Sequence, residues 1–351
     1  MTSDKGILIQ NIYYMLTYAF QVLKQENYRE VAAEEFERIQ DLFAAILAKG
    51  ISQQLKQGLY REYVSRQEAL PVLRGKLNIN ETIQNRIQQR KVLTCEFDEL
   101  SEDNRFNQIL KTTAELLMRE KTVAAEQKQA LKRVLPFFDG VQTVNPSSIR
   151  WNTLRFQRMN RSYEMLLNVC RLVLDGMLQT TEDGRYKMTA FSDEHMERLY
   201  ERFILEYYRQ HHPPLKASAS QVPWALDENA DSVSACFLPT MQTDIMLRCG
   251  DRTLIIDAKY YGHTMQTHYD RHRVHSANLY QIFTYVKNQE AAQTGSVSGM
   301  LLYAKTKETI VPDFTLGITG NQISVKTLDL NKPFALIARQ LDEIAQKSFC
   351  V

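Results

Sequence analysis

Two acidic residues and one lysine in the C-terminal half of the sequence have types and spacing suited to metal-assisted hydrolysis. Asp244 lies in one apolar, strand-like stretch, and Asp257 and Lys259 lie two positions apart in the next. Carboxylates facing each other on neighbouring strands repel unless a cation separates them, and Mg²⁺ prefers oxygen ligands of this kind. The lysine would then orient a water molecule or stabilise charge on a phosphoryl group. The alternative is an exposed hairpin end whose charges are solvated.

The two stretches are expected to form a hairpin that brings these side chains together. Gly250-Asp251 separates them and is typical of a two-residue turn with glycine at its first central position. This turn pairs Cys249 with Arg252, and counting outward places the two carboxylates directly opposite each other, with Cβ atoms about 4.5–5.5 Å apart. Lys259 projects from the same face as the acid two positions before it, because side chains alternate along a strand.

Helical and strand-like patterns surround the hairpin. Residues 276–286 have the apolar spacing of an amphipathic helix, on which Gln281 and Tyr285 lie one turn apart on one face. Residues 297–304 form an apolar run typical of a buried strand, and residues 196–208 form an amphipathic helix before the hairpin. The expected order is therefore helix, strand, strand with the lysine, helix and strand.

This order resembles the core of the PD-(D/E)xK nuclease superfamily, with the Q-x-x-x-Y helix found in several of its branches. The resemblance implies that Asp244, Asp257 and the main-chain carbonyl of Ala258 bind Mg²⁺, and that Lys259 assists the attacking water. Thr243 stands where the superfamily motif has proline, at a position that varies widely among its members.

The same resemblance assigns roles to the flanking helices. Gln281 and Tyr285 would shape the site from the helix that follows the hairpin. In the superfamily the preceding helix often supplies a further acid towards the metal, a role open to Glu201 or Glu206. Both glutamates are equally compatible with plain surface charges.

Six short motifs occur in order along nearly the whole chain: Asn11–Ala19, Pro71–Leu77, Phe97–Asp103, Thr243-Asp244, Asp257–Tyr261 and Asn278–Gln281. Together they resemble the McrC family, the nuclease subunit of the McrBC modification-dependent restriction system. The resemblance implies Mg²⁺-dependent cleavage of double-stranded DNA near modified cytosine, in complex with a hexameric AAA+ GTPase of the McrB type whose GTP hydrolysis this subunit stimulates. Two alternatives remain open: a catalytically silent activator or adaptor of the GTPase, and a PD-(D/E)xK nuclease of DNA repair.

Two domains are expected. Residues 1–184 should form an α+β domain that engages the partner, and residues 185–351 an α/β PD-(D/E)xK nuclease domain with a central mixed sheet flanked by helices. The boundary is a polar turn ending at Gly184. Within the first domain, helical patterns over residues 104–121, 124–135 and 162–178 accompany a small β section with strands at residues 58–66 and 68–80.

By resemblance, part of the first domain inserts into the central pore of the GTPase hexamer, and Gly58 to Leu77 is the candidate segment. Arg61, Arg66 and Arg74 would meet acidic pore residues or position a group at the nucleotide site. A surface hairpin with solvated arginines is the alternative. The sequence contains no G-x-x-x-x-G-K-[ST] motif, so this chain is not expected to bind a nucleotide itself.

A polar loop between the lysine strand and the next helix is rich in histidine and arginine. Arg271 and Arg273 are candidates for contacts with DNA phosphates, which would position the substrate without reading its sequence. Simple solvent exposure is the competing interpretation, and a transition metal bound on a helix is a third. The histidines with the spacing for that metal site are His268, His272 and His275.

Composition is ordinary for a globular protein. The 351 residues suffice for two domains with separate cores, and 44% of them are hydrophobic and 24% charged. A formal net charge of +2 is small for a stand-alone DNA binder, so DNA affinity is expected to come chiefly from a partner. The five cysteines include no C-x-x-C pair, which favours a cytoplasmic protein with reduced thiols. The uncharged stretch at residues 7–23 is interrupted by polar side chains, so no membrane anchor is expected.

Overall fold

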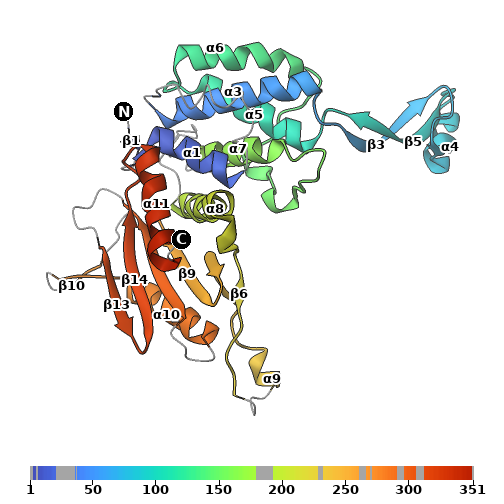
Figure 1. The fold of residues 1–351 in the computed structure, drawn as a ribbon. Helices are drawn as coiled ribbons and strands as arrows, with labels where there is room; N and C mark the ends of the chain where they lie inside the picture. Colours follow the sequence, from blue (N-terminus) through green and yellow to red (C-terminus); the bar gives the residue numbers. More distant parts are fainter. Residues whose placement is uncertain are drawn as a thin grey trace. The chain divides into compact units, whose positions relative to one another are not determined.

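The computed structural model describes residues 3–4, 7–20, 36, 38–178, 193–227, 232–260, 266–268, 271–290, 296–305 and 312–349 (Figure 1). The chain forms two compact units. Unit 1 comprises residues 1–42 and 190–351, and unit 2 comprises residues 43–189. The boundary between residues 189 and 190 lies near the division expected at residue 184. The N-terminal residues 1–42, however, belong with the C-terminal part of the chain rather than with the partner-binding domain to which the sequence pattern assigned them.

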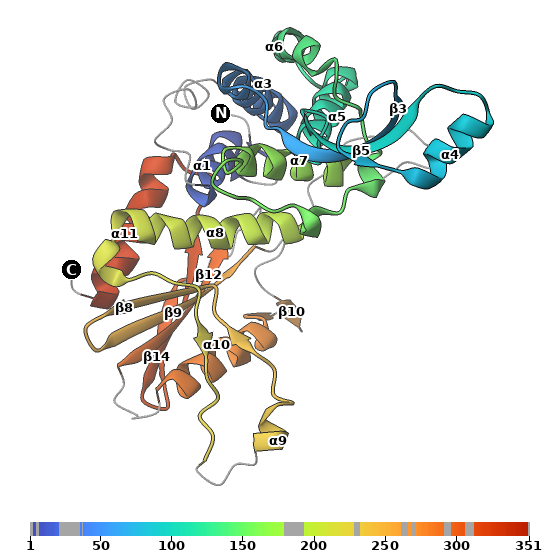
Figure 2. The same ribbon diagram turned by 90° about the vertical axis from the view of Figure 1, so that its right-hand side faces the viewer.

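Unit 1 is built around a five-stranded sheet in the order β13–β14–β12–β9–β8 (Figures 1 and 2). Its strands are β8 (Ile245–Cys249), β9 (Arg252–Lys259), β12 (Val297–Ala304), β13 (Phe314–Ile318) and β14 (Asn321–Leu328). Strand β12 is parallel to β9 and β14, whereas the edge strands β8 and β13 run antiparallel to their neighbours. The expected mixed sheet is confirmed.

Helices cover both faces of β9. Helix α10 (Ser276–Gln289) packs on β9 and β12, and Gly299 permits the close approach because a Cβ there would lie 2.8 Å from side-chain atoms of both Ile282 and Val286. Helix α8 (Asp193–His211) packs against β8 and β9. Residues on both faces of β9 are therefore buried, as in a strand covered on both sides. The consecutive buried residues include Leu254, Ile255, Ile256, Asp257 and Ala258.

The N-terminal helix α1 (Ile9–Ala19) is part of the same core. It packs against α8, and the side-chain amide of Asn11 donates hydrogen bonds to the carbonyls of Leu330 and Lys332 at 2.7 and 2.8 Å. Tyr14 stacks on Phe334, the first residue of α11 (Phe334–Phe349), with ring centroids 4.3 Å apart. The Asn11–Ala19 motif thus serves the packing of unit 1.

Shorter elements complete unit 1: β1 (Ser3–Asp4), β2 (Ile7–Leu8), η4 (Pro213–Leu215), β6 (Gln221–Val222), α9 (Ser232–Ala235), β7 (Met241–Gln242), β10 (Gln266–His268) and β11 (Arg271–Arg273). No helix in the described part of the chain combines the length and apolar character that crossing a membrane requires.

Unit 2 is a helical body that carries a β arm (Figures 1 and 2). The body contains most of α3 (Ile39–Gln57), then α5 (Arg105–Arg119), α6 (Ala125–Val134), η1 (Leu135–Phe138), η2 (Pro146–Ser148), η3 (Trp151–Thr153) and α7 (Tyr163–Leu178). The arm consists of β3 (Glu62–Leu70), β4 (Lys76–Leu77), α4 (Ile79–Ile87) and β5 (Leu93–Ser101), with sheet order β3–β5–β4.

The expected strand at residues 68–80 is wrong in part. Strand β3 ends at Leu70, a turn follows, and the side chain of Asn78 caps α4 by accepting a hydrogen bond from the amide of Glu81 at 3.3 Å. Gly75 in the turn has φ +68°, and a Cβ there would lie 2.4 Å from the carbonyl oxygen of Glu96. Only glycine fits this conformation without strain.

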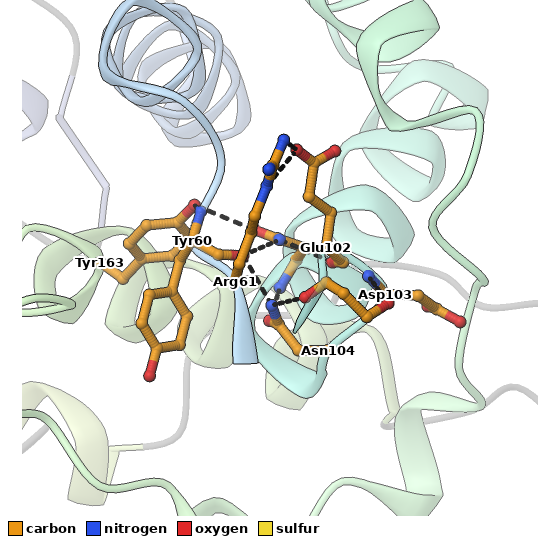
Figure 3. A network of polar contacts seen from close by, with 8 residues as sticks. Tyr60, Arg61, Glu102, Asp103, Asn104 and Tyr163 are labelled. Atoms are coloured by element: carbon orange, nitrogen blue, oxygen red, sulfur yellow. Dashed lines mark hydrogen bonds and ion pairs between the residues drawn. The ribbon is translucent and has the colours of Figure 1, made fainter. Parts of the chain in front are cut away.

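A polar network holds the base of the arm (Figure 3). The carbonyl of Tyr60 accepts hydrogen bonds from the side-chain amides of Asn104 and Asn107 at 2.7 and 2.9 Å, and its amide donates to the hydroxyl of Tyr163 at 2.9 Å. Asn107 also donates to the carbonyl of Glu102 at 2.8 Å. The end of the Phe97–Asp103 motif is therefore where the arm is fixed to the helical body.

Candidate active site

The hairpin between β8 and β9 has the expected register. Cys249 pairs with Arg252 and Ile245 pairs with Ile256, so the next position outward sets Asp244 against Asp257. Gly250 adopts φ +56°, the left-handed conformation that such a tight turn demands. The main-chain amide of Ala258 donates a hydrogen bond to Oδ2 of Asp244 at 2.9 Å, which draws this carboxylate onto β9.

Thr243 fixes the chain just before Asp244. Its amide donates to the carbonyl of Ser220 at 3.0 Å, and its hydroxyl donates to the same carbonyl at 2.8 Å. The hydroxyl also accepts a hydrogen bond from the amide of Ser220 at 3.2 Å. A proline here would lack the amide donor and the hydroxyl, so threonine gives the first acid a different but well-anchored support.

Lys259 lies at the centre of a group of acids. Its Nζ is 3.1 Å from Oδ1 of Asp257, 3.9 Å from Oδ2 of Asp244 and 3.9 Å from Oε1 of Glu197. The structure therefore brings the three central predicted residues together. It adds Glu197 of α8, which the sequence pattern did not single out.

Asp257 is the most buried member of this group. Its side chain is 1% exposed; Oδ1 lies 3.1 Å from the ammonium group of Lys259, and Oδ2 has no hydrogen-bond partner among the described residues. A buried carboxylate without hydrogen-bond donors is costly unless a cation compensates it. One lysine faces at least three acids here, so the site has an excess of negative charge.

The pKa values in the site follow from burial and this charge excess. Burial raises the pKa of Asp257 to about 7, while the charge of Lys259 opposes the rise and that of Asp244 adds to it. Burial likewise raises the pKa of Asp244, against the opposing charge of Lys259 and the hydrogen bond from Ala258. For Lys259, burial alone would lower the pKa, but Asp257 and Asp244 outweigh it and the pKa is raised.

Glu201 is electrostatically part of the site, whereas Glu206 pairs with an arginine of its own helix. Burial, followed by repulsion from Asp244, raises the pKa of Glu201 to about 8. Glu206 instead forms an ion pair with Arg209 at 2.7 Å, one turn further along α8. Of the two glutamates proposed from the sequence, Glu201 is the one whose pKa is raised by burial and by the charges of the two aspartates.

Mg²⁺ fits the donors that are present. Among the described residues, no three His, Cys, Asp or Glu side chains form a ready-made ligand group. Mg²⁺ does not require one, because it is usually held by one or two carboxylates and keeps several waters. Asp244 and Asp257 supply those carboxylates, and Oδ2 of Asp257, which is buried without a hydrogen-bond partner among the described residues, is the observation that fits a cation best.

Helix α10 supports the neighbouring strand. Tyr303 of β12 is the register partner of Lys259, and its hydroxyl accepts a hydrogen bond from the side chain of Asn278 at 3.1 Å. Gln281 donates to the hydroxyl of Tyr285 at 3.0 Å, so the two predicted helix residues bond to each other. Their roles in shaping the site stay predictions.

The histidine and arginine loop forms a short hairpin rather than a helix. Strands β10 and β11 pair antiparallel, with Gln266 opposite Arg273 and His268 opposite Arg271. A metal site that depends on helical spacing of these histidines is therefore wrong. The side chains of Arg271 and Arg273 lie outside the described part, and their contacts with DNA phosphates stay a prediction.

The three candidate arginines of the arm are paired within the arm. Arg61 lies 2.6 Å from a carboxylate oxygen of Glu102, and Arg66 lies 3.0 Å from Glu99. Arg74 lies 3.8 Å from the same Glu99, and its guanidinium group lies 4.0 Å from the ring centroid of Phe97. These side chains are also partly exposed, so their role in partner binding stays a prediction.

The fold and the site together define a mixed α/β domain with a buried carboxylate–lysine centre. The model of the McrBC 5-methylcytosine restriction system component family matches residues 4–304, and this chain belongs to that family. It is similar to the type IV methyl-directed restriction enzyme EcoKMcrBC of Escherichia coli (strain K12), with 26% identity over 343 residues that cover 96% of this chain and 97% of the relative.

A solved structure supports the fold. It is described as a half-complex from a tetradecameric assembly of Thermococcus gammatolerans McrB AAA+ hexamers with bound McrC. The similarity has a TM-score of 0.52 at 19% identity and covers 96% of this chain and 76% of that chain.

Proposed function

We propose that this chain is the DNA-cleaving subunit of its restriction system, with a Mg²⁺-dependent PD-(D/E)xK site at Asp244, Asp257 and Lys259. The observation that carries the proposal is the buried carboxylate of Asp257, which has one oxygen paired with Lys259 and the other without a hydrogen-bond partner among the described residues, next to a second aspartate. Family membership supports restriction as the setting, with DNA that contains modified cytosine as the substrate.

Each residue has a role that follows from its surroundings. Asp244, Asp257 and the main-chain carbonyl of Ala258 would hold Mg²⁺, which when bound acts as a Lewis acid and activates water. Before a metal ion binds, the aspartates raise the pKa of Lys259, which keeps it protonated and able to donate hydrogen bonds. It would orient the attacking water and stabilise negative charge on the phosphate.

The test compares the wild-type chain with Asp257→Ala in the presence of the McrB-type GTPase, GTP, Mg²⁺ and methylated plasmid. We expect the wild type but not Asp257→Ala to cleave the plasmid, and both proteins to stimulate GTP hydrolysis equally. Equal cleavage by both proteins would place the reaction elsewhere. Stimulation of GTP hydrolysis without any cleavage would favour an adaptor.

We further propose that the arm of unit 2 engages a hexameric AAA+ GTPase partner. Three isoleucines spaced four residues apart lie on one side of α4 and are unusually exposed: Ile79 by 63%, Ile83 by 52% and Ile87 by 76%. An apolar helix stripe exposed at the end of an arm is typical of a protein-binding surface. The related structure contains McrC bound to McrB hexamers, which indicates the kind of partner.

This second proposal has a direct test. Ile83→Glu is expected to weaken binding to the GTPase and its stimulation at least tenfold, without lowering the thermal stability of the free chain, because the side chain is already exposed. Phe137→Glu is the matched control, since Phe137 is 64% exposed on the helical body of unit 2. Equal effects of both substitutions would contradict a specific role for the arm.

A further inference from the structure

The chain that leads into α7 in unit 2 carries an uncompensated group of positive charges. Arg150, Arg155, Arg158 and Arg161 lie within 12 residues, which we call the arginine segment (residues 150–161). No Asp or Glu occurs from Gly140 to Tyr163, so this stretch has a formal charge of +4, whereas the entire chain has only +2.

The four arginines are exposed and unpaired. None of their side chains forms an ion pair or hydrogen bond with another residue in the described part of the chain, and each is exposed to solvent. The arm differs in this respect, because Arg61, Arg66 and Arg74 all bind glutamates there. The arginine segment therefore presents its charge outward.

Its backbone is nevertheless held in place. The buried side chain of Asn160 accepts a hydrogen bond from the amide of Gln157 at 2.6 Å and donates one to the carbonyl of Arg155 at 3.2 Å. Phe156 packs edge to face on Phe106, with ring centroids 5.8 Å apart. A segment that is already ordered loses less conformational entropy when it binds a ligand.

The chemistry of the segment fits a phosphate backbone. Besides arginine, the exposed side chains between Gly140 and Tyr163 are mainly amides and hydroxyls, the groups that proteins use to contact DNA phosphates and sugars. They include Asn145, Ser147, Ser148, Asn152, Thr153, Gln157 and Ser162. An interface with an acidic protein would also be expected to have an apolar centre. Here Phe156 is packed on Phe106, which leaves Met159 as the mostly exposed large apolar side chain of the segment.

We propose that the arginine segment is a DNA-binding surface of unit 2, separate from the candidate active site in unit 1, that contacts the phosphate backbone of duplex DNA without reading its sequence. The inference rests on the proposed function only in taking DNA as the ligand. It assigns this chain DNA affinity of its own, beyond what a partner supplies.

The test measures binding of the full chain to a short, unmethylated, fluorescein-labelled duplex by fluorescence anisotropy over a series of salt concentrations. EDTA is present throughout, so that binding is measured without cleavage. The variant combines Arg155→Gln, Arg158→Gln and Arg161→Gln. The control combines Lys121→Gln, Lys132→Gln and Arg133→Gln, which removes the same charge from exposed residues of unit 2 outside the arginine segment.

The variant is expected to bind DNA about tenfold or more weakly, with a salt dependence reduced by roughly 0.9 per lost phosphate contact, or about three in log–log slope. The control is expected to keep the wild-type slope. An unchanged slope in the variant, or equal losses in both proteins, would overturn the inference. Intact DNA binding with weakened GTPase binding would also overturn it and indicate an acidic protein surface.

Failure of the proposed function would be visible separately. A chain that binds duplex through the arginine segment but never cuts methylated DNA with Mg²⁺ and its partner supports this inference and contradicts the nuclease. If the wild-type chain cuts methylated DNA but the arginine variant binds duplex DNA as tightly as the wild type, the nuclease is supported and this inference is contradicted.

Discussion

The substitution Asp257→Asn is expected to stabilise unit 1 when no divalent cation is present. It keeps the shape of the side chain and removes its charge. Lys259 is not left alone, because Asp244 and Glu197 each lie 3.9 Å from its ammonium group. The change therefore tests directly whether Asp257 is an excess negative charge or one half of a balanced ion pair.

The magnitude follows from the pKa of Asp257. Burial is the main reason that this pKa rises from 3.8 to about 7 in the folded protein. Between these values the folded chain binds a proton that the unfolded chain has released, so stability falls as the pH rises through this range. Above pH 7 the charged Asp257 lowers the free energy of unfolding by its full amount. This is about 4 kcal/mol, because each tenfold change in proton affinity corresponds to about 1.4 kcal/mol. A buried, unpartnered asparagine amide offsets about half of the gain, which leaves about 2 kcal/mol.

Hydrogen exchange measured by mass spectrometry on peptides that cover β9 provides the assay. At pH 8 in EDTA, a gain of about 2 kcal/mol slows exchange from the open state by roughly thirtyfold. At pH 5 the difference should largely vanish, because the wild-type carboxyl is then protonated. Asp251→Asn, an exposed change in the turn of the same hairpin, is the control and should have no effect.

Mg²⁺ adds a second comparison. It should slow exchange in the wild type and have little effect on Asp257→Asn, since a ligand that binds only the folded state stabilises it. Faster exchange in Asp257→Asn than in the wild type at pH 8 in EDTA would refute the reasoning. That result would mean that Asp257 and Lys259 form a compensated buried ion pair, whose disruption is destabilising.

Three further substitutions separate the parts of the molecule. Thr243→Val removes the hydroxyl that anchors the chain before the first acid, and it should cost about 1 to 3 kcal/mol by urea unfolding and reduce DNA cleavage while GTPase stimulation is retained. Gly75→Ala places a Cβ against the carbonyl of its neighbouring strand at φ +68°, so exchange in β5 should accelerate and GTPase stimulation should fall, with β9 peptides unaffected. Glu197→Gln should lower the pKa of Lys259 and slow cleavage, whereas Glu206→Gln should cleave like the wild type; equal rates for the two glutamine variants would contradict a role for Glu197.

The hairpin was predictable because local rules determine it. A two-residue turn at Gly250-Asp251 fixes the register, and the register alone sets the first aspartate against the second. The order of α8, β8, β9, α10 and β12 follows equally well from apolar runs and helical periodicity. These features depend on residues that are close together in the sequence.

Features that depend on tertiary packing were not predictable in this way. Helix α8 carries several acids, and only its packing against β8 and β9 brings Glu197 near Lys259 while Glu206 pairs with Arg209. Helix α4 was missed because its isoleucines face solvent instead of a core, so no buried apolar face indicated it. The pairing of the arm arginines depends on the register between β3 and β5, which no short turn specifies.

The assignment of residues 1–42 to unit 1 changes how the two proposed activities are related. Unit 2 is inserted between α1 and α8, two helices that pack against each other within unit 1. Helix α8 also supplies Glu197, which lies beside Lys259, and α1 is fastened to the residues before α11 by Asn11. The part of the chain proposed to bind the GTPase is therefore connected at both ends to elements that position the candidate active site. The Asn11–Ala19 motif and the two aspartates therefore belong to the same unit.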